Sequence, residues 1–193
     1  MLPRNIQLNN SQIIFYPAQF WPHKNHIRLL QATLHLKDKG FNFKVELSGT
    51  DKGNLNSVKE FIHEKGLEKD VRLLGYISDE EIAKSYNRAQ LVVIPSYLGP
   101  NMMPILESWY FKRPLIASKV FENEYQTGAL YFDPNSFEDL AKEAASAISR
   151  LSSPGFLIVP ASTREVTSDL LSLTNNSGVA PTILETKKVQ VVG

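Results

Sequence analysis

The sequence predicts an α/β protein with a doubly wound, mostly parallel, Rossmann-like sheet of about six strands. Short apolar segments alternate with helix-forming segments between residues 12 and 150, which is the pattern of repeated strand–helix–strand units. One of these segments, LVVIP at residues 91–95, is apolar at every position. Strands buried on both faces of a parallel sheet have this composition, whereas half-exposed strands alternate apolar and polar residues. The order of the strands is left open.

Six segments are predicted to be strands because they are short, rich in apolar, β-branched or aromatic residues, and bounded by turn residues. The first ends near Pro17, which cannot donate a hydrogen bond to a neighbouring strand. The second, FKVELS, alternates as a strand does. In chain order, the six segments are residues 12–18, 43–48, 71–76, 91–95, 114–118 and 129–132.

The segments between the strands have apolar residues three or four positions apart, as amphipathic helices do. Helices are predicted to start at about residues 24, 55, 78, 104 and 136, and residues 119–128 are predicted to be a polar connection. Gly40 and Gly66 suit the ends of the first two helices. Ser78 and Glu81 match a capping box, in which the two side chains accept hydrogen bonds from free backbone N–H groups at the start of a helix.

Composition divides the chain into three parts. Residues 1–11 are a polar lead-in without a pattern, and residues 12–150 form the predicted domain. Residues 151–193 are rich in Ser and Thr and do not continue the alternation. We expect an irregular C-terminal tail there, with short strands at FLIVP and VQVV as the alternative.

Charge and composition exclude several classes of protein. The 193 residues contain no cysteine, which excludes disulfides and cysteine-based zinc sites or nucleophiles. The 21 basic and 20 acidic side chains nearly balance, unlike those of a dedicated nucleic-acid binder. No apolar run approaches the roughly 20 residues of a membrane span, and the first residues lack the apolar core of a signal peptide. We therefore expect a cytoplasmic protein, with peripheral membrane contact from the cytoplasmic side left open.

Loops that follow the strands of such a sheet form its binding crevice. The loop after the first strand places Lys24 near the start of a helix, where a cation beside free N–H groups suits a diphosphate. The alternative is a solvated lysine. His23 and His26 lie three positions apart, but no third metal ligand accompanies them. Capping, packing or a hydrogen bond to substrate is therefore favoured over a metal pair.

The second and third loops give weaker signals. SGTDKGN contains two glycines and Lys52, but it lacks the GK[ST] ending of a P-loop. The chain also has no GxGxxG pattern, which argues against a dinucleotide site of that type. Past the third strand, Gly75, Tyr76 and Ile77 offer backbone groups and a flat ring that suit a nucleotide base.

The fourth loop leads into a helix that carries one acid. Gly99 and Pro100 suit a turn, and Pro104 suits the first turn of a helix. Glu107 follows one turn later, where a carboxylate can accept hydrogen bonds from ribose hydroxyls. The alternative is that this acid only compensates the helix dipole. The residues by themselves leave the two interpretations open.

Taken together and in this order, the four loops resemble the donor-binding domain of retaining glycosyltransferases with the GT-B fold, the family-4-like group 1 enzymes. The resemblance covers residues 13–148. It is carried by the segments FYPAQFWPHKNHIRLL, LSGTDKGN, VRLLGYISDEEIAKSYNRAQLVVIPS, YLGPNMMPILE and GALYFDPNSFEDLA. Within the group, the chain is similar to a bacterial, mannosyltransferase-like branch that builds surface polysaccharides.

The resemblance implies catalytic roles for Lys24, which matches a lysine on the donor diphosphate, and for Glu107, which matches a glutamate on the ribose. Two positions depart from the family pattern: Gln19 replaces an arginine, and Gly99 replaces the first of two glutamates. The residues that the loops and the resemblance assign to substrate binding are Gln19, His23, Asn25, Lys52, Gly75, Tyr76, Ile77, Gly99, Pro100, Asn101, Met102 and Met103.

The implied function is transfer of a sugar from a nucleotide-diphosphate sugar, with retention at the anomeric carbon, to a saccharide or lipid-linked acceptor in polysaccharide biosynthesis. GDP-mannose is the donor that the branch suggests, and neither a metal nor a separate cofactor is expected. The acceptor-binding domain of such an enzyme is expected to be missing from this chain. Two alternatives remain: a non-catalytic nucleotide-sugar-binding or partner-subunit module, and a sugar-nucleotide epimerase-like protein of the same fold.

Overall fold

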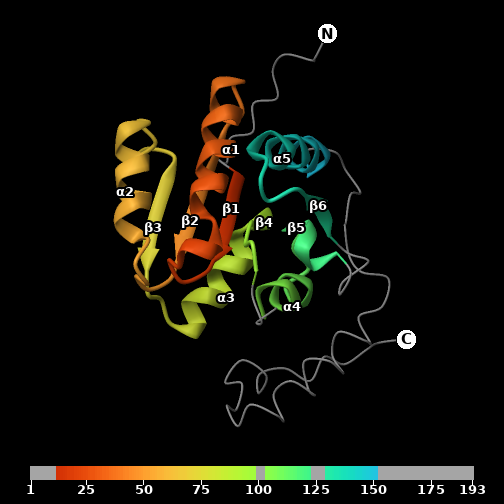
Figure 1. Ribbon diagram of the computed structural model, residues 1–193. Helices are drawn as coiled ribbons and strands as arrows, with labels where there is room; N and C mark the ends of the chain where they lie inside the picture. The colour runs from red at the N-terminus through yellow and green to blue at the C-terminus, as the bar shows by residue number, and fades with distance from the viewer. Residues whose placement is uncertain (1–11, 99–102, 123–128, 152–193) are drawn as a thin grey trace, which may run out of the picture.

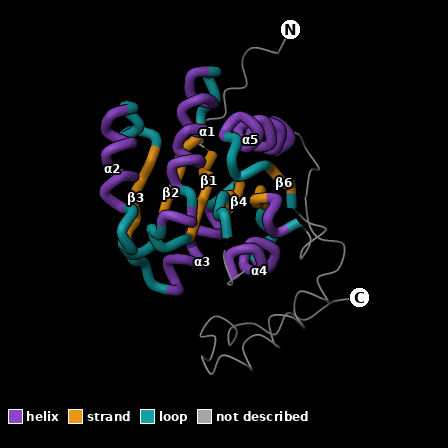
Figure 2. The backbone as a smooth tube through the Cα atoms, in the orientation of Figure 1, coloured by secondary structure: helices purple, strands orange, loops and turns teal. Residues whose placement is uncertain are grey.

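A six-stranded, entirely parallel sheet forms the centre of the protein, as Figures 1 and 2 show for a computed structural model that describes residues 12–98, 103–122 and 129–151. The strands are β1 (Gln12–Pro17), β2 (Phe43–Ser48), β3 (Val71–Gly75), β4 (Leu91–Ile94), β5 (Leu115–Ser118) and β6 (Leu130–Phe132). Their order is β3-β2-β1-β4-β5-β6. The predicted fold class is confirmed, and every strand pair is parallel.

Helices cover both faces of this sheet. They are α1 (His26–Asp38), α2 (Leu55–Glu64), α3 (Asp79–Arg88), α4 (Met103–Tyr110) and α5 (Phe137–Leu151). In Figure 1, α1 lies between α2 and α5 on one side, and α3 and α4 lie on the other. Right-handed crossovers put α1 and α2 on one face, and α3 and α4 on the other, when the strand order reverses. Helix α5 follows the last strand, so it is not a crossover, and it packs beside α1.

The strand order reverses between β1 and β4, which pair through Ile14 with Leu91 and Phe15 with Val92. The chain first builds outward from β1 to β3 and then returns through α3 to β4 on the other side of β1. In doubly wound sheets, this topological switch point opens a crevice at the carboxyl ends of the two strands. The fold therefore determines where a ligand site is expected.

The core explains why the central strands have no polar alternation. Every residue of β4 and of β5 is buried, and the side chains of Val92 and Ile116 have no exposed surface. A strand with helices on both faces has no solvent side, so apolar residues fill both sets of positions. The sequence LVVIP was interpreted in this way, and the structure confirms the interpretation.

The predicted helix caps are present. Ser78 Oγ accepts a hydrogen bond from the Glu81 backbone N–H at 3.3 Å, and the Glu81 carboxylate accepts one from the Ser78 N–H at 3.1 Å. Ser136 Oγ accepts from the Asp139 N–H at 3.0 Å at the start of α5. Within α5, Leu140 and Ile148 are buried. These ends are governed by residues three positions apart, so the sequence alone suffices to locate them.

Two local predictions differ from the structure in detail. The helix predicted to start at about residue 24 is present but begins two residues later: a short 3₁₀-helix, η1 (Pro22–Lys24), ends at Asn25, which has φ 56°, and α1 follows. Asparagine tolerates this left-handed conformation better than most residues. The connection predicted for residues 119–128 begins instead with a second 3₁₀-helix, η2 (Lys119–Phe121), where the Ser118 hydroxyl accepts from the Val120 N–H at 3.4 Å.

The predicted lead-in at residues 1–11 and the predicted tail from residue 152 onward lie outside the described residues. Within the described ranges, no helix combines the length and the apolar character needed to cross a membrane.

Candidate functional site

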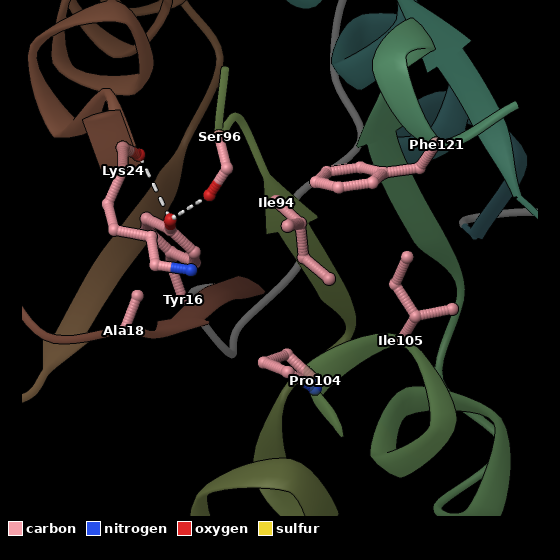
Figure 3. A pocket seen from close by; sticks show the side chains of 8 residues that line it. All are labelled: Tyr16, Ala18, Lys24, Ile94, Ser96, Pro104, Ile105 and Phe121. Carbon is pink, nitrogen blue, oxygen red and sulfur yellow. Dashed lines mark hydrogen bonds between the residues drawn. The ribbon is translucent and has the colours of Figure 1, made fainter. Parts of the chain in front are cut away.

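A small cavity lies at the topological switch point, between the carboxyl ends of β1 and β4 (Figure 3). Strand β1 and the loop after it supply one side, β4 supplies the floor, and the first turn of α4 and η2 supply the other side. The lining residues are Tyr16, Ala18, Lys24, Ile94, Ser96, Pro104, Ile105 and Phe121. We call this cavity and its lining the switch-point crevice.

Lys24 is the one charged side chain in that lining. It is half-buried, and no hydrogen bond or ion pair within the described ranges engages its ammonium group. Burial lowers the pKa of Lys24 because the charged form loses water and gains no acidic neighbour in exchange. A partly desolvated cation of this kind attracts an anion.

Tyr16 of β1 fixes the backbone of Lys24 by a hydrogen bond. The Tyr16 hydroxyl donates to the Lys24 carbonyl oxygen at 2.9 Å and lies 3.0 Å from Ser96 Oγ, as the dashed lines in Figure 3 show. Tyr16 is buried, and burial raises the pKa of its phenol. The phenol has one proton, so Tyr16 donates to Lys24 and Ser96 donates to Tyr16. These two hydrogen bonds connect the loop after β1, which carries Lys24 and is called the lysine loop below, to the end of β4.

The lysine loop is also bonded to the loop after β2. The Ala18 and Phe20 N–H groups donate to the Ser48 and Thr50 carbonyls, each at 2.9 Å. Gly49 lies between these two acceptors with φ 150°, and a Cβ atom on it would lie 2.3 Å from the Ala18 carbonyl oxygen. Only glycine permits this close approach. The two loops therefore form one layer beside the crevice.

His26 is fully buried directly under this layer, at the start of α1. Its ring stacks on Phe20, with 4.5 Å between centroids, and lies 4.9 Å from the Tyr16 ring. Neither ring nitrogen has a well-oriented hydrogen-bond partner among the described residues. Burial lowers the pKa of His26 to about 4, against a smaller opposing effect of the Ala18 backbone. The imidazole is thus neutral, and it packs against the two aromatic rings.

Three of the predicted substrate-binding side chains gather around Trp21, which sequence reasoning missed. Trp21 Nε1 donates to Gln19 Oε1 at 3.0 Å, its ring stacks near His23 with 6.1 Å between centroids, and the Lys52 ammonium lies 5.9 Å from the ring centroid. The Trp21 side chain is 41% exposed. A tryptophan in a loop predicted to bind ligand was the available signal.

His23 lies beside Lys24 in η1, and its pKa is lowered, first by desolvation and then by the Lys24 charge. Its carbonyl accepts from the Tyr97 N–H at 2.9 Å, which ties η1 to the residues after β4. Among the described residues, no three His, Cys, Asp or Glu side chains are grouped so that they could hold a metal ion.

Asn25 is buried, and its amide nitrogen donates to the carbonyls of Pro95 at 3.0 Å and Pro134 at 3.1 Å. These bonds join the lysine loop to the end of β4 and to the residues after β6. Both N–H bonds of the side chain are therefore engaged within the protein. The contact of Asn25 with substrate stays a prediction. Of its side-chain polar atoms, only Oδ1 is left to make that contact.

Glu107 lies one helical turn beyond Pro104, on the side of α4 that meets α3. The Tyr86 hydroxyl donates to Glu107 Oε2 at 2.8 Å. Burial raises the pKa of Glu107, the Tyr86 hydrogen bond opposes this shift, and the Asp79 charge adds to it. Glu107 does not line the small cavity of Figure 3, but Pro104, one helical turn earlier, does.

Tyr86 is a second residue that sequence reasoning did not assign to the site. It lies on α3, and its side chain is buried. A phenol at a buried position carries a hydroxyl that needs a partner, which was the available signal. Here the partner is the carboxylate of Glu107.

The remaining predicted residues that the structure describes lie at the end of β3 and at the start of α4, outside the lining of the crevice. Gly75, with φ 67°, ends β3, and Tyr76 beyond it is 79% exposed. Ile77 is half-buried next to it, and Met103 is half-buried at the start of α4. Gly99, Pro100, Asn101 and Met102 lie outside the described residues, so their predicted roles stay predictions.

Comparison with known proteins gives the family of the chain. The model of the family described as "Glycosyl transferases group 1" matches residues 3–152. Serotype-specific mannosyltransferase WbdA of Escherichia coli is 30% identical over 124 residues, which are 63% of this chain and 15% of WbdA. The chain therefore spans less than a sixth of that relative.

Solved structures share the fold. A glycosyltransferase from Rickettsia africae ESF-5 has a TM-score of 0.66 and 25% identity, covering 75% of this chain and 39% of that one. Anabaena Alr3699/HepE, solved in complex with UDP-glucose, has a TM-score of 0.67 and 18% identity, covering 84% of this chain and 49% of HepE. The likeness to HepE concerns the fold alone.

Proposed function

Because the chain belongs to the glycosyl transferases group 1 family, we propose that it binds a nucleotide-diphosphate sugar at the switch-point crevice as the donor for sugar transfer. The observation that carries the proposal is Lys24: a half-buried ammonium in that crevice, without a hydrogen bond or acidic partner among the described residues. The anion that suits it is the donor diphosphate. A phosphate oxygen would restore to the ammonium the hydrogen bonds that it lost on leaving water.

Glu107 receives the ribose in this proposal. The distance along α4 supports the assignment, since Pro104 lines the crevice and Glu107 lies one turn further along. One nucleotide would then lie with its diphosphate near Lys24 and its ribose near Glu107. The base would extend toward Gly75, Tyr76 and Ile77, whose backbone and ring follow β3.

The reaction that we propose is transfer with retention at the anomeric carbon to a saccharide or lipid-linked acceptor. Negative charge develops on the leaving diphosphate as the bond to the sugar breaks. Lys24 stabilises that charge, and its fixed loop means that little reorganisation is needed at that moment. Lys24 is therefore the catalytic residue, and Glu107 binds and orients the donor.

GDP-mannose is the donor that we propose to test first. Its support is the likeness to a mannosyltransferase, together with the resemblance to a mannosyltransferase-like branch. UDP-glucose is the second donor, because a protein of the same fold was solved with it. The base and the sugar are thus open between these two, while the diphosphate is common to both.

A non-catalytic binding module is the second candidate function. Its support is the neutral Gln19, where the family pattern has an arginine, and the amide of Gln19 is already occupied by Trp21 at 3.0 Å. One cation fewer at the diphosphate would weaken stabilisation of the leaving group more than it weakens binding. Binding without transfer is the outcome that distinguishes this candidate.

Calorimetric titration of the full chain with GDP-mannose, UDP-glucose and ADP-glucose tests the proposal. We expect one of the three to bind, and Lys24→Ala to weaken its binding at least about tenfold, the effect of losing one charge-assisted hydrogen bond. Lys59→Ala, at an exposed lysine of α2, is the matched control and should bind as the parent does. No binding by the parent, or equal binding by the Lys24→Ala chain, would contradict the proposal.

Transfer is measured separately, with radiolabelled donor and saccharide acceptors. We expect little transfer from this chain by itself, because it spans only 15% of WbdA and 39% of the Rickettsia glycosyltransferase. Transfer that rises when the chain is fused to an acceptor-binding domain would favour the enzyme over the binding module.

A further inference from the structure

We propose that Tyr86 is a positioning residue for Glu107, because its hydroxyl holds one carboxylate oxygen and leaves the other directed to the paired hydroxyls of the donor ribose. This inference rests on the proposed function, in which Glu107 receives the ribose. The inference adds Tyr86 of α3 to the site, whereas Glu107 lies on α4.

The contact between the two side chains is short and specific. The Tyr86 hydroxyl lies 2.8 Å from Glu107 Oε2 and 3.5 Å from the Pro104 carbonyl oxygen. A phenol has one proton to donate. Tyr86 donates it to Glu107, because that contact is the shorter one and a carboxylate is the stronger acceptor. Glu107 Oε1 makes no hydrogen bond within the part of the chain that the structure describes.

The phenol ring cannot move away from this position. Tyr86 is fully buried, with the Phe111 ring stacked on it at 5.0 Å between centroids and 5° between planes. The Phe15 ring meets it edge-on at 5.2 Å and 89°. Phe15 belongs to β1, and Phe111 follows α4 directly. The sheet and the helix that carries Glu107 therefore fix the hydroxyl together.

The free oxygen suits a pair of neighbouring hydroxyl groups. An ionised carboxylate only accepts hydrogen bonds, and each of its oxygens has two lone pairs. The 2′- and 3′-hydroxyls of a ribose are adjacent donors, so a single fixed oxygen can accept from both. Without Tyr86, the carboxylate would be free to rotate, and ordering it on binding would cost side-chain entropy.

A purely structural role of Tyr86 makes a different prediction. If the phenol only fills the space between α3 and α4, its loss should weaken every nucleotide by the same factor. If it orients Glu107, its loss should weaken ribonucleotides and leave deoxynucleotides nearly unchanged. The ratio of the two affinities therefore separates the roles, and it does not depend on the fraction of folded protein.

The experiment uses GDP and UDP together with their 2′-deoxy and 3′-deoxy forms as probes, titrated into the full chain. We expect the parent to prefer the better-binding ribonucleotide over its deoxy forms by about tenfold, the effect of about one hydrogen bond. Tyr86→Phe keeps the ring and removes the hydroxyl, and it should lose most of that preference. Glu107→Gln should lose it as well, and the double variant should lose no more than Glu107→Gln.

Tyr110→Phe is the matched control, because Tyr110 lies on α4, is 45% exposed and contacts Phe111 without reaching the acid. It should keep the preference of the parent. If Tyr86→Phe does not fold, Phe111→Leu removes the ring that stacks on Tyr86 and should lower the preference partly.

An unchanged preference in Tyr86→Phe would overturn the inference, as would an equal loss for ribonucleotide and deoxynucleotide. For a Tyr86→Phe chain that does not fold, an unchanged preference in Phe111→Leu overturns it in the same way. The proposed function can fail separately: a parent that binds neither GDP nor UDP refutes this inference, whereas the titration with the three nucleotide sugars decides the proposed function. A parent that binds GDP or UDP without preferring the ribose refutes this inference and the role of Glu107, while leaving Lys24 as the diphosphate contact.

Discussion

The hydroxyl of Tyr16 donates to the carbonyl oxygen of Lys24 at 2.9 Å, so a buried strand residue holds the loop that carries the half-buried lysine. The same hydroxyl lies 3.0 Å from Ser96 Oγ at the end of β4. One phenol thus connects both strands of the topological switch point. The position of the ammonium group follows from this connection and from the bonds between the neighbouring loops.

Tyr16→Phe should lower the stability of the protein while keeping an aromatic ring in the core. The variant keeps the ring and leaves the Lys24 carbonyl and the Ser96 hydroxyl without this partner. We expect a loss of about 1–3 kcal/mol in the free energy of unfolding, the cost of leaving buried polar groups unpaired. Urea unfolding measures it. Tyr110→Phe, at an exposed ring, should change the same quantity by less than about 0.5 kcal/mol.

Gly49→Ala should be strongly destabilising, because its Cβ atom would lie 2.3 Å from the Ala18 carbonyl oxygen, a backbone atom that cannot move without displacing the lysine loop. We expect a loss of at least about 2 kcal/mol. Gly53→Ala is the matched control in the same loop: its φ is 94°, but a Cβ atom there meets nothing within 4 Å. Gly53→Ala should therefore cost only the backbone strain, about 1–2 kcal/mol. Equal losses in the two variants would show that the close approach has no effect.

Two substitutions of Asn25 should separate its backbone conformation from its hydrogen bonds. Asn25→Gly permits φ 56° and removes the bonds to the Pro95 and Pro134 carbonyls, so it should cost about 1–2 kcal/mol. Asn25→Ala removes the same bonds and adds left-handed strain, so its cost should be larger by about 1 kcal/mol. Thermal unfolding of the three chains gives the comparison. A smaller loss in the alanine variant than in the glycine variant would contradict this account.

Because the pKa of Glu107 is raised, its ionisation should lower the stability of the folded protein as the pH rises. Its pKa is higher in the folded chain than in the unfolded chain, chiefly because of burial. The folded state then binds the proton more tightly, so ionisation of Glu107 costs stability as the pH rises through the folded pKa. Glu107→Gln cannot ionise. Its stability relative to the parent should therefore be greater at pH 7 than at pH 4, as measured by urea unfolding at both values.

Glu80→Gln is the control of opposite sign. The pKa of Glu80 is lowered by its hydrogen bond and ion pair with Lys84, at 2.6 Å. A lowered acid stabilises the fold above its unfolded pKa and loses that effect as the pH falls through the folded pKa. Glu80→Gln should therefore be less stable than the parent at pH 7 and nearly equal to it at low pH. The effect should be small because the pair is exposed.

Much of the fold could be predicted because its signals are local. The apolar run at β4 and the box formed by Ser78 and Glu81 depend on neighbours in the chain, and both were located within one or two residues. The break before α1 could not be predicted in this way. Asn25 is held in its left-handed conformation by carbonyls 70 and 109 positions away, which no local pattern contains.

The candidate site divides along the same line. Lys24 and Glu107 were predicted from residue type, position after a strand and family resemblance, and their roles stay predictions. Tyr86, Ser96 and Trp21 were not assigned to the site, because each matters through a contact with a residue that the sequence does not place beside it. Gln19, His23 and Lys52 were predicted as separate ligand contacts, and the structure gathers them around the Trp21 ring.

The sequence by itself determined the α/β class, the strands, the helix caps and the loops that follow the strands, because periodicity and capping act over a few residues. Only the tertiary structure decided that β1 and β4 lie side by side, that Lys24 stands half-buried without a partner among the described residues, and that Tyr86 reaches Glu107. The physical reason is that burial and hydrogen bonding depend on distance in space, and the folded chain brings Tyr16 to Ser96 across 80 positions.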